Sequence, residues 1–136
     1  MSILDQFRLN GRRALVTGGS RGLGLEMARG LAEAGAEVVI VGRDTGSLAE
    51  AVAAIEAGGG RAAALQADLA DGEEAERMCA AALERFDRID IVVNNVGGRR
   101  INFPTEDLPL EEWRRIVELN LTQAFVCTKL LGAPML

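Results

Sequence analysis

Apolar and polar residues follow one another along this chain in two alternating patterns. Four short runs have the composition and length of buried strands, at 14–17, 37–41, 61–67 and 89–93. The third run is the weakest of these predictions, because alanine dominates it. After each run comes a longer segment in which apolar residues return every three or four positions, as on one face of a helix, at 22–34, 47–57, 71–86 and 109–131. This succession predicts an α/β fold of the Rossmann-like, doubly wound kind, with a parallel sheet covered on both faces.

The connections between the strands constrain the topology of the sheet. Crossovers between parallel strands are right-handed. In doubly wound sheets the chain returns after the third strand and adds its fourth strand on the other side of the first. The predicted strand order is therefore 3-2-1-4, with a crevice between the first and fourth strands.

The helical segments also predict which faces are buried. In the first helix, Leu23, Met27 and Leu31 recur at four-residue steps and are expected to face the sheet. Ala28 and Ala32 lie beside them and allow close approach. The third helix is expected to bury one stripe of small and apolar residues: Ala75, Met78, Cys79, Ala82 and Phe86.

Residues that stabilise helix ends indicate where the helices begin. Ser47 with Glu50 has the spacing of a capping box, in which two side chains bind free N–H groups of the first helical turn. Asp71 with Glu74 has an equivalent spacing before the third helix. Pro109 is expected to open the fourth helix, where the missing N–H of proline matters little.

The fourth helix is apolar on more than one side. One set of its residues is expected to cover the fourth strand: Trp113, Ile116, Val117, Ala124 and Cys127. Leu119, Phe125 and Leu130 point elsewhere around the helix. A helix that is apolar nearly all round is expected to be buried nearly all round, and monomers seldom leave such a patch open. We therefore expect a symmetric homo-oligomer with this helix at a two-fold axis.

Composition argues against several classes of protein. With 136 residues, 49% of them hydrophobic, residues 1–136 have the size and apolar content of a single domain. The net charge of −5 gives no reason to expect a nucleic acid or a membrane surface as partner. The sequence has no apolar run of about 18 residues and no apolar signal segment at its start, so we expect a cytoplasmic protein. Cys79 and Cys127 are expected to be buried, unpaired thiols, and no metal site is predicted.

The segment between the first strand and the first helix is rich in glycine and reads Thr17-Gly18-Gly19-Ser20-Arg21-Gly22-Leu23-Gly24. Glycines let the backbone turn tightly and approach a pyrophosphate, while the N-terminus of the following helix directs N–H groups at the anion. Glycine-rich turns are common, but here a strand precedes and a helix follows, which is the context that a dinucleotide site requires. We therefore predict a phosphate-binding loop.

The spacing of this loop resembles that of the short-chain dehydrogenase/reductase family in its non-extended branch: Thr-Gly, three residues, Gly, one residue, Gly. Three further motifs follow in the order of the family. They are Asp68-Leu69 after the third strand, Asn94-Asn95-Val96-Gly97 after the fourth strand, and Asn120 in the fourth helix. Val96 stands where the family usually has alanine. The four motifs together extend over the whole chain.

The resemblance implies roles for these residues. Asp68 and Leu69 would hold the adenine ring, although an aspartate on a solvated strand end would be unremarkable alone. The Thr17 hydroxyl would tie the first strand to the turn at Asn94, whose side chain we expect to be architectural rather than catalytic. Asn120 would belong to the catalytic tetrad, at a local kink of the helix that holds a water of the proton relay. A buried asparagine within a helix needs partners for its amide.

The end of the second strand bears on the choice of cofactor. In dinucleotide folds an acidic residue there binds the adenosine ribose and repels a 2′-phosphate. Gly42 occupies that position and Arg43 follows, while Arg21 lies in the glycine-rich loop. Two guanidiniums suit a phosphate dianion, which predicts NADP(H) in preference to NAD(H). In the alternatives, Arg43 caps the second strand and Arg21 is solvated, or a register shift of two residues brings Asp44 to the ribose.

The chemistry that the family performs is incomplete in this sequence. The resemblance implies hydride transfer between a carbonyl and a secondary alcohol, with a tyrosine, a lysine four residues later and a serine. The sequence contains no tyrosine and no histidine, and Lys129 is its only lysine. Of the catalytic set only Asn120 is present. Three hypotheses remain open: part of a longer enzyme, a half-domain that binds nucleotide without catalysis, or a module completed by another chain along an open sheet edge.

The substrate is little constrained by the sequence. Arg99 and Arg100 follow the turn after the fourth strand, on the side where open α/β sheets bind ligands. They could meet a carboxylate or phosphate of a small-molecule substrate, or they could simply be solvated. The resemblance implies 3-oxoacyl-carrier-protein reductases and gluconate 5-dehydrogenase-like or other sugar-acid and polyol dehydrogenases as neighbours, without choosing among them.

Overall fold

The computed structural model describes residues 1–98 and 102–136. Its centre is a sheet of four strands: β1 (Arg13–Thr17), β2 (Glu37–Gly42), β3 (Arg61–Gln66) and β4 (Ile91–Val93). The strands lie in the order β3-β2-β1-β4, and every neighbouring pair is parallel. The predicted fold class and strand order are therefore confirmed.

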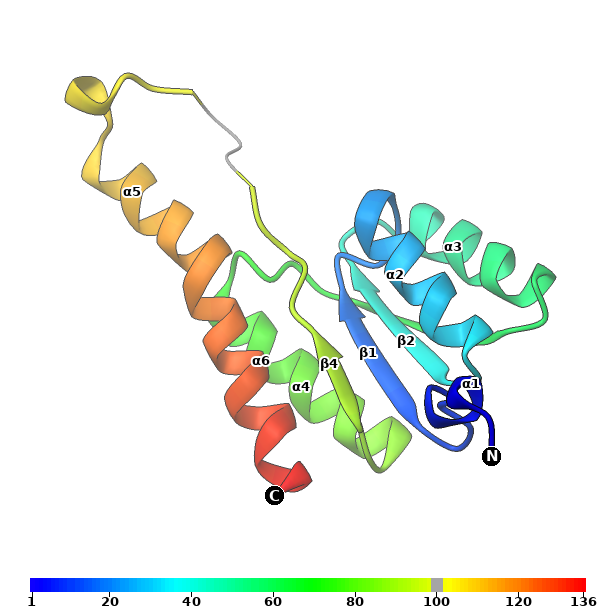
Figure 1. Cartoon of the computed structure of the whole chain (residues 1–136). Coiled ribbons are helices and arrows are strands. Elements are labelled where there is room, and N and C mark those ends of the chain that lie inside the picture. Colours follow the sequence, from blue (N-terminus) through cyan, green and yellow to red (C-terminus); the bar gives the residue numbers. More distant parts are fainter. Residues whose placement is uncertain (99–101) are drawn as a thin grey trace.

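Helices cover both faces of this sheet (Figure 1). A short helix, α1 (Ile3–Gln6), precedes β1, and α2 (Gly22–Glu33) and α3 (Thr45–Ala57) lie on one face. On the opposite face lie α4 (Gly72–Phe86) and α6 (Gln123–Gly132). A 3-10 turn (Thr105–Asp107) and α5 (Leu110–Val117) come before a π-helical turn (Glu118–Thr122) that continues directly into α6, and a second 3-10 turn (Ala133–Met135) follows.

Alternate residues of the central strands supply two apolar cores. On β1, Leu15 faces α4 and α6, while Ala14 and Val16 face α2 and α3. Val39 and Ile40 of β2 are divided between the two sides in the same way. All five side chains are fully buried. Burial on both faces explains why these strands are nearly continuous apolar runs, as expected for parallel strands.

The buried face of α2 differs from the prediction. Leu23 is 79% exposed and Met27 is 37% exposed, and Leu31 is only partly buried. The helix instead turns its smallest residues, Ala28 and Ala32 among them, to the sheet. These residues allow the helix axis to approach the strands closely, which larger side chains at the same positions would prevent.

The helix caps are partly as predicted. Asp44, and not Ser47, caps α3, because its carboxylate accepts hydrogen bonds from both the N–H and the hydroxyl of Ser47. Asp71 caps α4 as expected, accepting from the N–H groups of Glu73 and Glu74. The Glu74 carboxylate does not close the capping box but accepts from the N–H of Asp68, at 2.5 Å. The predicted stripe of α4 is buried in full.

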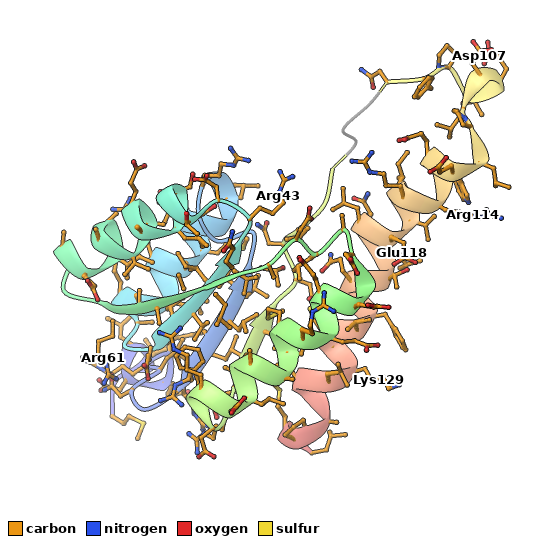
Figure 2. The ribbon with its side chains drawn as sticks, turned by 180° about the vertical axis from the view of Figure 1, so that it is seen from behind. Arg43, Arg61, Asp107, Arg114, Glu118 and Lys129 are labelled. Atoms are coloured by element: carbon orange, nitrogen blue, oxygen red, sulfur yellow. The ribbon has the colours of Figure 1, made fainter. Side chains whose placement is uncertain are left out.

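The fourth helical segment is not buried all round. It divides into α5, the π-helical turn and α6, and α5 projects beyond the carboxyl end of the sheet, where Arg114 lies well away from the strands (Figures 1 and 2). For this reason Trp113, which was expected to cover β4, is 55% exposed. Leu119, expected to point elsewhere, is buried, and Phe125 is 62% exposed. None of the described helices has both the length and the apolar character needed to cross a membrane.

Asp90 holds the amino-terminal end of the sheet together. Its carboxylate accepts from the N–H of Arg13 at 2.8 Å and from the guanidinium of Arg88 at 3.0 Å. Burial raises the pKa of this carboxyl, but the Arg13 N–H and the charges of Arg88 and Arg12 outweigh burial and leave the pKa below its ordinary value.

Replacing Asp90 by asparagine is expected to lower the free energy of unfolding at neutral pH by about 1.5–3 kcal/mol, the usual contribution of hydrogen bonds to a charged group. A lowered carboxyl pKa contributes stability above the unfolded-state pKa, and this contribution is lost as the pH falls through the folded-state pKa. Urea unfolding from pH 7 to pH 3 is the measurement. The gap between the two proteins should begin to narrow below about pH 4 and close as the pH falls through the lowered pKa of the folded-state Asp90 carboxyl, and a gap that stays constant with pH would contradict this role.

Candidate functional site

A cleft of about 650 Å³ lies at the carboxyl ends of the strands. The segments that follow all four strands contribute to its walls, as expected at the reversal point of a doubly wound sheet. The cleft is lined by Gly18, Ser20, Arg21, Val41, Gly42, Arg43, Asp44, Ser47, Ala67, Asp68, Leu69, Asn95, Val96, Gly97, Gly98 and Leu119.

The glycine-rich loop between β1 and α2 forms the floor of this cleft. Gly18 and Gly22 have φ values of +64° and +57°, in the left-handed region that favours glycine. A Cβ atom on Gly24 would lie 2.0 Å from the carbonyl oxygen of Gly18, so no larger residue fits there without displacement of the backbone. Arg21, at the N-cap of α2, makes no capping hydrogen bond with its side chain. The first N–H groups of α2 are thus not capped by that side chain and can bind an anion.

Thr17 ties this loop to the segment after β4. Its hydroxyl donates to the carbonyl of Val93 at 3.3 Å and accepts from the N–H groups of Asn95 at 2.9 Å and Val96 at 3.3 Å. The side chain of Asn95 donates in turn to the carbonyl of Gly18. Thr17 is fully buried and does not line the cleft. Its position is the one that the sequence predicted, joining β1 to the turn at Asn94.

The π-helical turn around Asn120 forms another wall. The Asn120 amide donates to the carbonyl of Ile116 at 2.9 Å and to the carbonyl of Gly98 at 2.9 Å, and its oxygen accepts from the N–H of Gly98 at 2.8 Å. The irregular helix that the sequence predicted is therefore present. Asn120 is exposed, however, and not buried as expected. Its amide nevertheless finds main-chain partners.

The end of β2 gives the cleft its charge. Gly42 is the last residue of β2, and Arg43 follows it at the carboxyl edge of the sheet (Figure 2). Arg21 and Arg43 both line the cleft and are exposed. Asp44 lines it as well, but hydrogen bonds from the N–H and hydroxyl of Ser47 hold the pKa of this carboxyl below its ordinary value, with the charge of Arg21 adding to the effect. The Asp44 carboxylate is therefore bound to the N-terminus of α3.

Asp68 and Leu69 lie where the segment after β3 enters the cleft. The Asp68 carboxylate accepts from the N–H of Ala70 at 3.1 Å, in a turn that fixes its direction. Leu69 is buried and joins the core beneath. Glu74 of α4 secures the Asp68 main chain from below through the 2.5 Å hydrogen bond.

The structure brings together most of the residues that the sequence singled out. Those that line the cleft are Gly18, Ser20, Arg21, Arg43, Asp68, Leu69, Val96 and Gly97. Those that the described cleft does not include are Thr17, Gly22, Leu23, Gly24, Asn94 and Asn120. Arg99 and Arg100, considered for substrate binding, lie outside the described residues.

Sequence reasoning assigned neither Leu119 nor Gln123 to the cleft or its surroundings. Leu119 lines it, although its place on the helix predicted another direction. Gln123 is 1% exposed and donates to the carbonyl of Val96 at 3.0 Å. A glutamine among the apolar residues of α6 was the one available signal, since a buried amide requires a partner.

Comparison with known proteins yields consistent matches. The model of the short chain dehydrogenase family matches residues 12–136. The 3-oxoacyl-[acyl-carrier-protein] reductase of Synechocystis sp. is 41% identical, over 94% of this chain and 52% of that protein. The gluconate 5-dehydrogenase of Gluconobacter oxydans is 43% identical, over 92% of this chain and 48% of that protein.

Solved structures give the same picture. The crystal structure of a 3-oxoacyl (acyl-carrier-protein) reductase from Agrobacterium tumefaciens C58, with NADP bound, superposes with a TM-score of 0.90 at 34% identity. The match covers 99% of this chain and 52% of that one. The chain therefore spans about half the length of the relatives that it matches.

Proposed function

We propose, since this chain belongs to the short-chain dehydrogenase family, that residues 1–136 form the NADP(H)-binding half of an oxidoreductase. Bound NADP(H) supplies or accepts a hydride, by which a small-molecule carbonyl and a secondary alcohol are interconverted. The observation that carries the proposal is the cleft itself, where a glycine-rich loop at the N-terminus of α2, which includes Arg21, lines the same cavity as Arg43.

The residues present fit such a cofactor. The cleft of about 650 Å³ lies within the usual range of ligand sites. Gly24 lets α2 pack closely against the loop at Gly18, and we assign the pyrophosphate to the N–H groups of Gly22, Leu23 and Gly24 together with Gly18 and Ser20. At one side we assign the adenine ring to Asp68 and Leu69. At the other side we assign the nicotinamide half to the segment Asn94–Gly97.

The preference for NADP(H) over NAD(H) rests on Arg21 and Arg43. Both guanidiniums border the cleft beyond β2, where a 2′-phosphate would lie, and each can donate two hydrogen bonds to it. Asp44, the alternative partner of a ribose hydroxyl, already accepts two hydrogen bonds at the cap of α3. The structure of the Agrobacterium tumefaciens relative, described with NADP bound, supports the same choice.

We assign cofactor binding, and not turnover, to these 136 residues. The proton donor of the family is a tyrosine, and the sequence contains none. Asn120 is the one member of the catalytic set in the chain, and its hydrogen bonds to Gly98 and Ile116 fix the π-helical turn beside the cleft. A half-domain that binds nucleotide without catalysis is the alternative. The two readings share the same cofactor site.

Calorimetric titration of the full chain with NADPH and with NADH tests the proposal. One charge-assisted hydrogen bond contributes about 1.5–3 kcal/mol, so NADPH should bind roughly ten- to a hundredfold more tightly. Equal dissociation constants for the two nucleotides would contradict the choice of cofactor. Binding of neither would contradict the proposed function.

We further propose that α5 and α6 assemble with a second copy of this chain. Leu121 of the π-helical turn and Phe125 of α6 are 66% and 62% exposed, while α6 buries other residues in the core. Replacing Phe125 by aspartate should place a charge in the interface and lower the apparent mass in light scattering. Affinity for NADPH should not change, because Phe125 does not line the cleft. A wild-type chain that is monomeric at micromolar concentration would overturn this assignment.

A further inference from the structure

A row of hydrogen bonds joins residues 94–98 to the helix formed by the π-helical turn and α6. The amide of Asn94 donates to the hydroxyl of Thr128 at 3.0 Å, and the amide of Gln123 donates to the carbonyl of Val96 at 3.0 Å. Asn120 binds both the N–H and the carbonyl of Gly98, at 2.8 Å and 2.9 Å. We call this row the polar seam.

The geometry of the seam is regular. Residues 94, 96 and 98 alternate along the segment, and their partners 128, 123 and 120 run in the opposite direction along the helix. Four residues of extended chain span roughly 13 Å, and eight residues of helix span roughly 12 Å, so the two runs match in length. Asn95, which lies between the seam residues, donates to the carbonyl of Gly18 in the glycine-rich loop instead. The segment is therefore held from both sides.

Gln123 is the buried centre of the seam. It is 1% exposed, whereas Asn94, Asn120 and Thr128 are exposed. Its Oε1 atom is also buried and accepts no hydrogen bond from any residue that the structure describes. A buried amide whose oxygen has no hydrogen-bond partner is unfavourable for folding, and an apolar residue of the same size would pack there at least as well. Packing alone therefore does not account for glutamine at this position.

What the glutamine does is hold Val96. The side of the cleft opposite Arg43 is built from Val96, Gly97 and Gly98 together with Leu119. Val96 is only partly buried, so without the Gln123 amide its carbonyl could turn toward water, and this wall would move. Two of the wall residues are glycines, which do not resist such movement on their own.

We propose that Gln123 is a positioning residue, which sets the wall at residues 96–98 for the bound dinucleotide at the expense of stability. The inference rests on the proposed function, because it concerns the same cleft. Gln123 acts on the side of the cleft away from Arg21 and Arg43, on which the preference for NADP(H) rests. Loss of the Gln123 amide should thus weaken the binding of NADPH and of NADH by the same factor, without altering the preference between them.

The test uses the full chain and the variant Gln123→Met, which keeps the length of the side chain and removes the amide. Losing one neutral hydrogen bond should raise both dissociation constants about three- to tenfold, with their ratio unchanged. The melting temperature should stay the same or rise. Without nucleotide, amide hydrogen exchange at Val96, Gly97 and Gly98 should become faster.

A threonine pair on the same helix supplies the control. Thr128→Val removes the outer bond of the seam and should speed exchange at residues 94–96. Thr122→Val makes the same change at a residue for which no hydrogen bond to the segment exists in the described chain, and should leave exchange and binding as they are.

Three results would overturn the inference: dissociation constants of Gln123→Met within twofold of wild type, a changed ratio between the nucleotides, or weaker binding together with a lower melting temperature. The third result would mean that Gln123 is an ordinary structural residue. If the wild-type chain binds neither nucleotide, the proposed function fails and the inference fails with it. If wild type binds and Gln123→Met binds equally well, only the inference fails.

Discussion

Replacing Arg43 by aspartate is expected to invert or erase the preference of this chain for NADPH over NADH. The substitution removes a forked donor from the edge of the cleft and puts a carboxylate near the 2′-position of the ribose. Loss of a charge-assisted contact costs about 1.5–3 kcal/mol, and repulsion of the phosphate adds to it. The dissociation constant for NADPH should rise by a factor of roughly a hundred or more, while that for NADH should stay the same or fall, as measured by calorimetric titration.

The matched control is Arg61→Asp. Arg61 is also exposed, but it is the first residue of β3 and lies at the amino end of the strands, whereas Arg43 lies at their carboxyl end (Figure 2). Its replacement changes the net charge by the same amount and should leave both affinities unchanged. A similar loss of NADPH affinity in both variants would mean that overall charge, and not a local contact, sets the preference.

Replacing Gly24 by alanine is expected to abolish binding of either nucleotide. The added Cβ would lie 2.0 Å from the carbonyl oxygen of Gly18 and 2.5 Å from the side-chain amide of Asn95. Relief of this clash must push α2 away from the loop, which disturbs the anion site and strains the packing by about 1–3 kcal/mol. Titration with NADPH and urea unfolding measure the two effects.

Gly30→Ala is the control on the same helix. Nothing lies within 4 Å of the position that its Cβ would occupy. This substitution should stabilise the chain by about 0.5–1 kcal/mol through helix propensity, without any effect on binding. A Gly24→Ala variant that binds NADPH as wild type does would show that the close approach of loop and helix is not required.

The sheet and the glycine-rich loop could be predicted from the sequence because local patterns determine them. Buried parallel strands are apolar at nearly every position, and right-handed crossovers leave few ways of ordering them. The packing of helices was harder to predict. Leu23 fits an apolar stripe in sequence, but close contact between α2 and the sheet selects the smallest residues and leaves Leu23 exposed. Trp113 is exposed because α5 extends past the end of β4, which no periodicity reveals.

The candidate site was likewise predictable only in part. Motif spacing located Asp68 and the arginines, because each lies in a segment that follows a strand, and the carboxyl ends of the strands face the cleft. Asp44 and Ser47 can both cap a helix, so only the structure decides between them. The contact of Gln123 with Val96 joins residues from separate elements, and no local pattern encodes their pairing.

The most direct test of the central claim, that the cleft binds NADP(H) through its 2′-phosphate, is a crystal structure of the full chain with NADPH. We predict 2′-phosphate oxygens at about 2.7–2.9 Å from guanidinium nitrogens of both Arg21 and Arg43, with the pyrophosphate at the N-terminus of α2. A 2′-phosphate that contacts neither arginine, or a nucleotide bound outside this cleft, would contradict the account.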